Sequence, residues 1–288
     1  MRIANNWEDY RLLDAGGGYR YERWGGYTVA RPDPAVIFPS RTGANIGVDA
    51  TYTRSASGGG SWDKQLPEQI ISYGDLKFKV KPTGFKHMGL FPEQAVNWDF
   101  YCEQIFQCFE KQNTVGRDVK ILNLFAYTGG ATLACAAAGA AVTHVDAAKG
   151  MVAWAKENAG LSGLVNASIR WIVDDCEKFI LREARRGNIY DGVIMDPPSY
   201  GRGVGGEVWK LEERLSSLIE SCAEILSDRP LFFAVNTYTT GVSHSAVEYI
   251  LRTVLGGKFA QYSGDEIGLP VESTGFSLPA GATVIGVN

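Results

Sequence analysis

The sequence has few of the residues from which metal centres and disulfide frameworks are built. Its 288 residues include three histidines and five cysteines, and no two cysteines form a Cys-x-x-Cys pair. An odd number of cysteines without such a pair argues against a disulfide framework and against a zinc site. We therefore expect no metal and no secreted, disulfide-stabilised fold.

Long apolar runs are also missing. No run reaches the roughly 20 residues that a membrane-spanning helix needs, and the N-terminal residues lack the apolar segment of a signal peptide. We expect a cytoplasmic protein without a membrane partner.

The chain has no excess of positive charge. Its net charge of −4 gives no overall attraction to nucleic acid, so a nucleic-acid substrate would need a local basic face. The two candidate clusters are Lys77, Lys79, Lys81 and Lys86, and Arg182, Arg185 and Arg186. The alternative for either cluster is an ordinary solvated face of a strand or helix, which we favour for the arginines.

Residues 1–81 differ from the rest of the chain. Between residues 10 and 38, short aromatic and β-branched runs are broken repeatedly by glycine and proline. This pattern is typical of small antiparallel hairpins. We predict a small β-rich N-terminal domain over 1–81 with little core of its own, then an irregular link over 82–96 and a helix over 97–111.

From residue 119 onward, short apolar runs alternate with longer amphipathic segments. Five such repeats predict an α/β fold with a doubly wound, mostly parallel sheet, whose ligands bind at the carboxyl ends of the strands. The expected strands are 119–125, 142–146, 169–173, 190–195, 231–235 and two near 258–267 and 282–287; the expected helices are 129–140, 149–159, one ending near 186, 208–226 (after a glycine-rich loop) and 244–255.

The chain is organised around residues 119–130. A buried strand ends there in Gly129 and Gly130, and an alanine-rich helix follows at once. Such a turn places unpaired N–H groups and the positive end of a helix dipole at the sheet edge, where a cofactor with a carboxylate or phosphate can bind. The alternative is an ordinary strand-to-helix turn, because no Gly-x-Gly-x-x-Gly pattern is present.

Acidic residues follow the next two strands. Asp146 comes about 20 residues after the glycine turn, where a carboxylate can accept hydrogen bonds from ribose hydroxyls. Asp174 and Asp175 end the third strand, and we prefer Asp175 as the acceptor of an adenine amino group. The alternative for each is a helix N-cap.

The sharpest signal is Asp196-Pro197-Pro198 at the end of the fourth strand. Consecutive prolines hold the chain rigidly, so the Asp196 carboxylate and nearby carbonyls are fixed beside the cofactor position. Tyr200 and Trp209 are aromatic surfaces on which a flat substrate could stack. A rigid structural exit from the strand is the alternative.

Together, these residues resemble the class I S-adenosylmethionine-dependent methyltransferases, most closely the branch that contains the large-subunit ribosomal RNA cytosine-C5 methyltransferases. The segment 84–94 is similar to the lead-in of that branch, and the resemblance covers residues 82–240. It implies a Rossmann-like seven-stranded sheet, with the last two strands antiparallel, in a methyltransferase domain over 82–288. The N-terminal hairpins resemble the branch's small β domain more loosely.

The resemblance also implies roles for particular residues. Asp196, Pro197 and Pro198 would face the target, and S-adenosylmethionine would be the cofactor. The expected cofactor-binding residues are Asn123, Phe125, Tyr127, Thr128 and Gly129 for the methionine part, Asp146 for the ribose, Asp175 and Cys176 for the adenine, Asp196, and Phe85, Lys86 and Gln94 closing over the cofactor.

Two features depart from the cytosine-C5 pattern. Those enzymes need a cysteine that adds to the ring, and the relatives carry it just after the fifth strand, where this chain has Asn236, Thr237 and Tyr238. The additional N-terminal RNA-binding domain of those relatives is not recognised either. The sequence therefore predicts a methyltransferase, with RNA, ribosomal RNA above all, as the expected substrate, and it leaves the target atom and the oligomeric state open. The alternatives are a non-catalytic RNA- or partner-binding module that keeps the fold, and a nicotinamide-dependent oxidoreductase.

Overall fold

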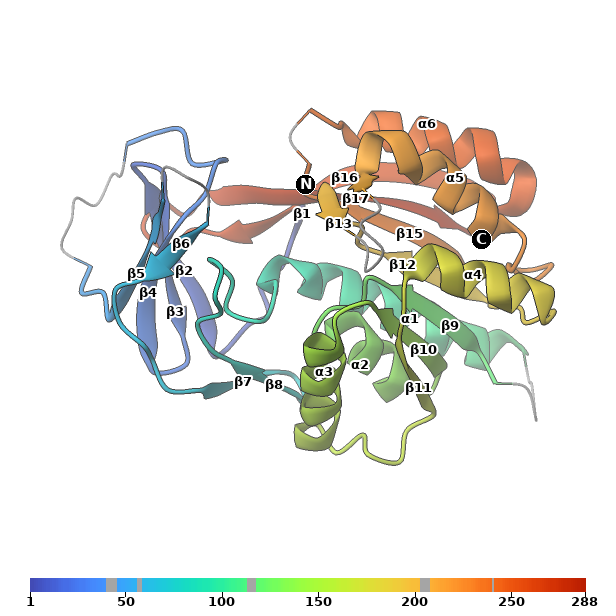
Figure 1. Ribbon diagram of the computed structural model, residues 1–288, viewed down its shortest axis with the longest axis horizontal. Coiled ribbons are helices and arrows are strands. Elements are labelled where there is room, and N and C mark those ends of the chain that lie inside the picture. The colour runs from blue at the N-terminus through green and yellow to red at the C-terminus, as the bar shows by residue number, and fades with distance from the viewer. Residues whose placement is uncertain (40–45, 56–58, 113–117, 203–207, 240) are drawn as a thin grey trace. The chain divides into compact units, whose positions relative to one another are not determined.

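The computed structural model describes residues 1–39, 46–55, 59–112, 118–202, 208–239 and 241–288 (Figure 1). They divide into two compact units: Met1–Val96 with Ile267–Ala280, and Asn97–Glu266 with Gly281–Asn288. The predicted domain boundary at 81/82 lies inside the first unit, so the division into domains at that point stays a prediction.

The largest sheet in the described residues has eight strands, in the order β1-β16-β17-β15-β12-β9-β10-β11. Seven correspond to the strands expected from the sequence. The eighth, β1, was not foreseen because two residues carry no periodic signal. The strands are β1 (Arg2–Ile3), β9 (Lys120–Leu124), β10 (Ala141–Asp146), β11 (Ile169–Val173), β12 (Gly192–Met195), β15 (Phe232–Thr237), β16 (Gln261–Pro270) and β17 (Ser277–Val287).

The strand directions give the α/β topology that the alternating pattern predicts. Strands β9, β10, β11, β12 and β15 pair in parallel, and β17 pairs antiparallel with β15. The chain runs from β9 outward to β11 and then returns to the other side of β9 with β12. The switch point between β9 and β12 is where such sheets bind ligands, at the carboxyl ends of the strands.

Helices cover both faces of this sheet (Figure 1). The alternation along β9 decides which side chains meet which helices: Leu122 and Leu124 join the core under α4, α5 and α6, whereas Asn123 reaches Thr132 of α2 on the other face. No helix of the described residues is long and apolar enough to cross a membrane. The helices are α1 (Ala95–Gln112), α2 (Gly130–Ala137), α3 (Lys149–Leu161), α4 (Cys176–Arg185), α5 (Leu211–Ala223), α6 (His244–Leu255) and the short 3-10 turns η1 (Pro92–Gln94) and η2 (Gly256–Lys258).

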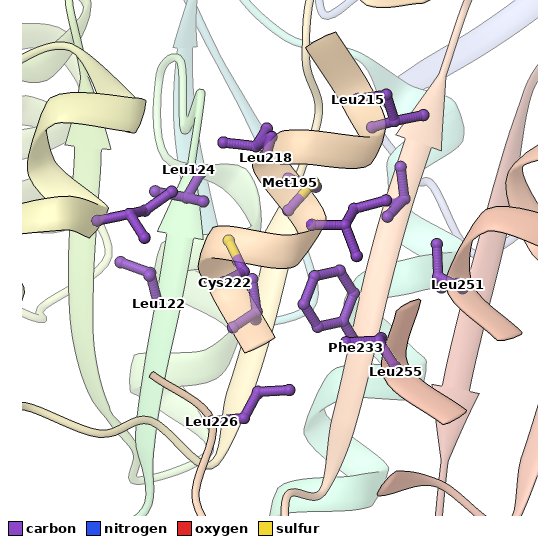
Figure 2. Packing of buried hydrophobic residues seen from close by; sticks show 14 of the residues in the cluster. Leu122, Leu124, Met195, Leu215, Leu218, Cys222, Leu226, Phe233, Leu251 and Leu255 are labelled. Atoms are coloured by element: carbon purple, nitrogen blue, oxygen red, sulfur yellow. The ribbon is translucent and has the colours of Figure 1, made fainter. Parts of the chain in front are cut away.

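The main core lies between the sheet and helices α4 to α6. Figure 2 shows Leu215, Leu218 and Cys222 of α5 in one cluster with Met195 and Phe233 of the strands, and all five are buried. Burying a side chain of this size contributes about 1.5–3 kcal/mol, so this face fixes α5 firmly on the sheet.

One predicted helix begins later than expected. Residues Val208–Lys210 form strand β14, antiparallel to β13 (Tyr200–Arg202), and α5 begins at Leu211. The β-prone pair Val208 and Trp209 favours the ribbon, and the acidic Glu212 and Glu213 favour a helix start just after it. Residues 203–207 of the expected glycine-rich loop lie outside the described residues.

The N-terminal region forms the predicted β-rich unit, but its core is larger than expected. Trp24, Ile71 and Phe78 are completely buried, and Trp7 packs against Tyr73 at 4.8 Å between ring centroids. Aromatic side chains bury enough area for a small sheet to have its own core, which the frequent glycines concealed. Its strands are β2 (Tyr10–Gly16), β3 (Tyr19–Trp24), β4 (Tyr27–Pro32), β5 (Ala50–Arg54) and β6 (Gly60–Trp62) in one sheet, and β7 (Gln69–Tyr73) with β8 (Leu76–Val80) in a hairpin.

A buried ion pair also stabilises this unit. Glu22 accepts hydrogen bonds from the Arg31 guanidinium and from the Tyr10 hydroxyl, the latter at 2.7 Å. Burial alone would raise the pKa of Glu22, but the charge and hydrogen bonds of Arg31 outweigh burial and lower it to about 2.

The contact between α1 and α2 gives a stability prediction. A Cβ added at Gly130 would lie 2.9 Å from Trp98 Cε2 and nearer still to Cζ2, whereas a Cβ at Gly150 on α3 would meet no atom within 4 Å. Because Trp98 is buried, we expect Gly130→Ala to lower the free energy of unfolding by about 1–3 kcal/mol. Gly150→Ala is the matched control and should leave it unchanged or raise it by up to about 1 kcal/mol. Urea unfolding of both variants measures the difference, and equal stabilities would contradict the packing.

Candidate functional site

The turn between β9 and α2 has a strained backbone. Phe125 and Tyr127 have φ angles of 54° and 50°, and they are the two non-glycine residues with positive φ in the described part of the chain. Gly129 follows with φ 91°. A non-glycine residue in this region costs about 1–3 kcal/mol, and such strain is concentrated at functional sites.

Three later elements hold this turn in place. The Tyr127 N–H donates to Asp146 Oδ2 at the end of β10 (2.9 Å), and the Phe125 N–H donates to Cys176 Sγ at the start of α4 (3.4 Å). On α3, Asn158 Nδ2 donates to the Thr128 carbonyl oxygen (2.9 Å), and both residues are completely buried. These bonds compensate the strain and connect the glycine turn to β10, α3 and α4.

Asp146 lies where the sequence places it, at the carboxyl end of β10. Its Oδ1 accepts the Ala148 N–H at 2.8 Å, so each carboxylate oxygen already has one donor. Burial raises the pKa of Asp146, and the two N–H groups limit that rise. Each oxygen keeps a second lone pair, with which it can accept a hydroxyl of a ligand.

The two acidic residues after β11 have structural partners. Asp175 is the N-cap of α4, and its Oδ1 accepts the Lys178 N–H at 2.9 Å. Asp174 Oδ1 accepts the Asp175 N–H at 2.9 Å, and Asp174 also forms an ion pair with Arg182. Asp175 thus caps the helix, as the alternative reading expected. Its hydrogen bond to an adenine amino group, which would use Oδ2, stays a prediction.

The Asp196-Pro197-Pro198 segment leaves β12 beside the glycine turn. The Asp196 N–H lies 3.4 Å from the Leu124 carbonyl oxygen, so the ends of β9 and β12 are neighbours. Asp196 is half-buried, Pro197 is buried and Pro198 is exposed. Trp209 Nε1 donates to the Pro198 carbonyl oxygen at 2.6 Å, and Tyr200 is 54% exposed.

The end of β15 holds a buried amide, at the place where the resemblance to cytosine-C5 enzymes would put a cysteine. Asn97 Nδ2 donates to Asn236 Oδ1 (3.0 Å) and to Thr283 Oγ1 (2.9 Å), and the Thr283 hydroxyl donates to Asn236 Oδ1 (2.6 Å). All three residues are at most 2% exposed, so Asn236 joins α1, β15 and β17. The five cysteines lie on α1, α2, α4 and α5, at Cys102, Cys108, Cys135, Cys176 and Cys222.

A second set of buried polar side chains, linked by hydrogen bonds, supports the turn. Asn123 Nδ2 donates to Thr132 Oγ1 (2.9 Å), and the Thr132 hydroxyl lies 2.9 Å from His144 Nδ1. The Thr132 hydroxyl can accept a second hydrogen bond or donate one, so its bond with His144 Nδ1 fits either tautomer of the imidazole. Burial, with the charge of Lys156, lowers the pKa of His144 to about 3, so this histidine stays neutral.

Phe85, Lys86 and Gln94 belong to the first compact unit. Phe85 is 69% exposed, Gln94 is buried, and Lys86 Nζ lies 3.4 Å from the Pro32 carbonyl oxygen. Burial lowers the pKa of Lys86. Their closing over a cofactor stays a prediction.

Sequence reasoning missed Asn158, Thr132 and His144 as supports of the turn. Each lies inside a helix or strand with no distinctive spacing, so only the fold brings it to its partner. One signal was available: Asn158 and Thr132 are polar residues among the alanines of their helices. No group of three or more potential metal ligands is found among the described residues.

Comparisons with known proteins agree with this geometry. The family model of S-adenosylmethionine-dependent methyltransferases matches residues 82–228. The chain is 30% identical over 202 residues to the ribosomal RNA large subunit methyltransferase K/L of Shewanella baltica (strain OS155 / ATCC BAA-1091), covering 68% of this chain and 26% of that protein. It is 33% identical over 168 residues to the protein of the same name from Shewanella sp. (strain ANA-3), covering 54% and 22%. The chain thus spans about a quarter of the length of these relatives.

A solved structure is similar over nearly the whole chain. The crystal structure of the S-adenosylmethionine-dependent methyltransferase from Agrobacterium tumefaciens is 35% identical, with a TM-score of 0.89, and the match covers 99% of this chain and 93% of that one. The similarity therefore includes the N-terminal β-rich unit as well as the large sheet.

The buried histidine predicts a pH dependence of stability. In the folded state the pKa of His144 is about 3, below the 6.5 of an unperturbed histidine, so the unfolded chain takes up the proton first. The contribution of His144 is complete above pH 6.5 and is lost as the pH falls, by about 0.8 kcal/mol between pH 8 and pH 6. His144→Asn keeps an acceptor for Thr132 but cannot titrate, so the free energy of unfolding of this variant should fall less over the same range. Urea unfolding at both pH values tests this, and an identical pH dependence would show that the pKa of His144 is not lowered in the folded protein.

Proposed function

Because the chain belongs to the S-adenosylmethionine-dependent methyltransferase family, we propose that it transfers the methyl group of S-adenosylmethionine to a nitrogen of an RNA base. One observation carries the proposal: the strained turn after β9 and the Asp-Pro-Pro segment after β12 lie side by side at the switch point of the sheet. A methyl donor and an acceptor must meet at such a point.

The residues around the strained turn suit this cofactor. The N-terminus of α2 has Gly129 as its cap and no capping side chain, so its N–H groups can receive the methionine carboxylate. Asp146 has lone pairs for the ribose hydroxyls, and Asp175 Oδ2 for the adenine amino group. Cys176 is buried beneath the turn and holds Phe125 through its sulfur.

S-adenosylmethionine supplies an electrophilic methyl group on a sulfonium. The protein's part is to position a nucleophile in line with it, and this alone can account for several kcal/mol of the barrier. Because the Pro198 carbonyl accepts the Trp209 indole N–H, the Asp196 carboxylate and the Pro197 carbonyl are the groups assigned to the acceptor. They accept an N–H of the base amine and direct the nitrogen lone pair at the methyl group.

A nitrogen acceptor agrees with the end of β15. Methylation of cytosine carbon 5 needs a thiolate that first adds to the ring, and Asn236 cannot supply one. Cys176 and Cys222 are buried, and burial raises the pKa of both thiols well above the usual range. The base would have to be unstacked from its neighbours to reach the Asp-Pro-Pro segment.

The lysines of β8 support an RNA substrate. Lys77 and Lys79 alternate with the buried Leu76, Phe78 and Val80, so they share the outer face of the β7–β8 hairpin, and Lys81 continues the row. Glu68 lies 3.7 Å from Lys79 and 2.5 Å from Lys81. The Arg182 and Arg186 side chains instead pair with Asp174 and Glu183, as expected for a helix face. The names of the Shewanella relatives favour ribosomal RNA, which would place the protein in the cytoplasm.

The cofactor site gives the first test. Asp146→Ala should weaken binding of S-adenosylhomocysteine by about 1–3 kcal/mol, because buried hydrogen-bond donors lose their acceptor. The same carboxylate has a raised pKa and binds best when ionised, so the wild-type affinity should be full at neutral pH and fall on acidification. Calorimetry measures both effects, with Asp174→Ala as the matched control at the end of the next strand. Normal binding by a folded Asp146→Ala variant would leave this residue a purely structural role, and wild-type protein that binds no sulfur cofactor at millimolar concentration would refute the proposal.

The acceptor site gives the second test. Asp196→Ala should leave the affinity for S-adenosylhomocysteine largely intact and lower transfer at least 100-fold, because the carboxylate is assigned to the acceptor. Asp196→Asn keeps one acceptor oxygen and should retain part of the activity. Methyl-labelled cofactor is incubated with total RNA, protein extract and small metabolites, and the labelled product is identified. Binding without transfer to any of them would favour the non-catalytic alternative, and label in protein or metabolite would rule out RNA.

The lysine row gives the third test. Replacing Lys77, Lys79 and Lys81 by glutamine should weaken RNA binding. It should also lower the slope of log Kd against log salt concentration by about 2 for single-stranded RNA. The control carries the same charge change at Lys120, Lys156 and Lys258, which are exposed on the second unit. Filter binding over a range of salt concentrations separates the two variants. Equal salt slopes would show that the lysine row is only a solvated strand face.

A further inference from the structure

Trp209 contacts the two loops on which the proposed reaction depends. Its indole Nε1–H donates to the carbonyl oxygen of Pro198 at 2.6 Å, on the loop that follows β12. Its ring also packs against the ring of Phe125, on the turn that follows β9, with 5.5 Å between the centroids and 51° between the planes. One side chain therefore links the acceptor segment to the cofactor turn.

The contact with Phe125 falls on a strained residue. Phe125 has a left-handed backbone with φ 54°, and its N–H is fixed to Cys176 Sγ at 3.4 Å. A residue in this conformation keeps it only where its surroundings determine it fully. The Trp209 ring lies against the Phe125 side chain, and the Cys176 sulfur accepts the Phe125 N–H.

Trp209 is itself held rigidly. It lies opposite Gly201 in the β13–β14 ribbon, and the Leu211 N–H, two residues later, donates to the Ser199 carbonyl oxygen at 3.1 Å. Leu211 opens α5, whose inner face is buried in the main core. The position of the indole is thus fixed by the same core that fixes the sheet.

We propose that Trp209 is a positioning residue that sets the distance between the methyl donor and the acceptor, through the Pro198 carbonyl and the Phe125 ring. The inference rests on the proposed methyl transfer. An in-line displacement is sensitive to small errors of approach, and a misplacement of about 1 Å can lower the rate about 100-fold. Tyr200, on the adjacent position of the ribbon and 54% exposed, is then the aromatic surface left for stacking with a base.

The test separates the hydrogen bond from the ring. Trp209→Phe keeps a ring against Phe125 but removes the N–H that Pro198 accepts, and Trp209→Ala removes both. The matched control is Trp171→Phe on β11, because the Trp171 indole N–H has no hydrogen-bond partner among the described residues. Each variant is measured for S-adenosylhomocysteine affinity and stoichiometry by calorimetry, and for kcat and KM with the RNA that the wild type methylates.

We expect Trp209→Phe to lower kcat about 10-fold and Trp209→Ala about 100-fold, with RNA KM and cofactor Kd within twofold of the wild type. Trp171→Phe should match the wild type in every parameter. The binding stoichiometry corrects kcat for any unfolded fraction, so loss of folded protein cannot imitate the effect.

Other outcomes would overturn the inference. An unchanged kcat in Trp209→Phe and Trp209→Ala would show that the indole only fills space, and a raised RNA KM with normal kcat would make it a stacking surface. Wild-type protein that binds the cofactor but methylates no RNA fails at an earlier step, and it would remove the proposed function together with this inference.

Discussion

The hydrogen bond from the Tyr127 N–H to Asp146 is the interaction on which the rest of the site depends. The turn that contains Tyr127 holds two non-glycine residues in a left-handed conformation, so it cannot be stable by itself. Asp146, Asn158 and Cys176 compensate this cost from β10, α3 and α4. The same bonds aim the N-terminus of α2 at the carboxyl edge of the sheet. The contacts that stabilise the turn are therefore the same ones that orient it for the binding role proposed above.

The alternation of strands and helices was predictable because it is a local property. Apolar runs of strand length, a glycine turn and Asp-Pro-Pro are each visible within a few residues, and they placed Asp146 and Asp196 at the strand ends. The supports of the turn were not predictable, because Asn158 and Thr132 gain their meaning only from distant partners. The β13–β14 ribbon was hidden for a related reason: strands of three residues give no period to detect.

The end of β15 shows how one place in a fold can serve different purposes. The resemblance to cytosine-C5 enzymes would put a nucleophile there, and in this chain Asn236 completes a buried network with Asn97 and Thr283. A buried amide with all its partners is costly to disturb, because any substitution leaves donors without acceptors. The network therefore gives Asn236 a structural role, which agrees with assigning the proposed chemistry to the loop after β12.

The order of the strands brings the two proposed functional loops next to each other. Because β9 and β12 are neighbours, the turn proposed for the methyl donor and the loop proposed for the acceptor leave adjacent strands, and the Asp196 N–H lies 3.4 Å from the Leu124 carbonyl. That backbone contact is long for a hydrogen bond and fixes the loops only at their bases. Further out, where a methyl group would move, the loops need a connection between side chains, and Trp209 between Pro198 and Phe125 provides one. The pairing of β9 and β12 thus fixes the two loops where they leave the sheet, and the Trp209 side chain connects them further out.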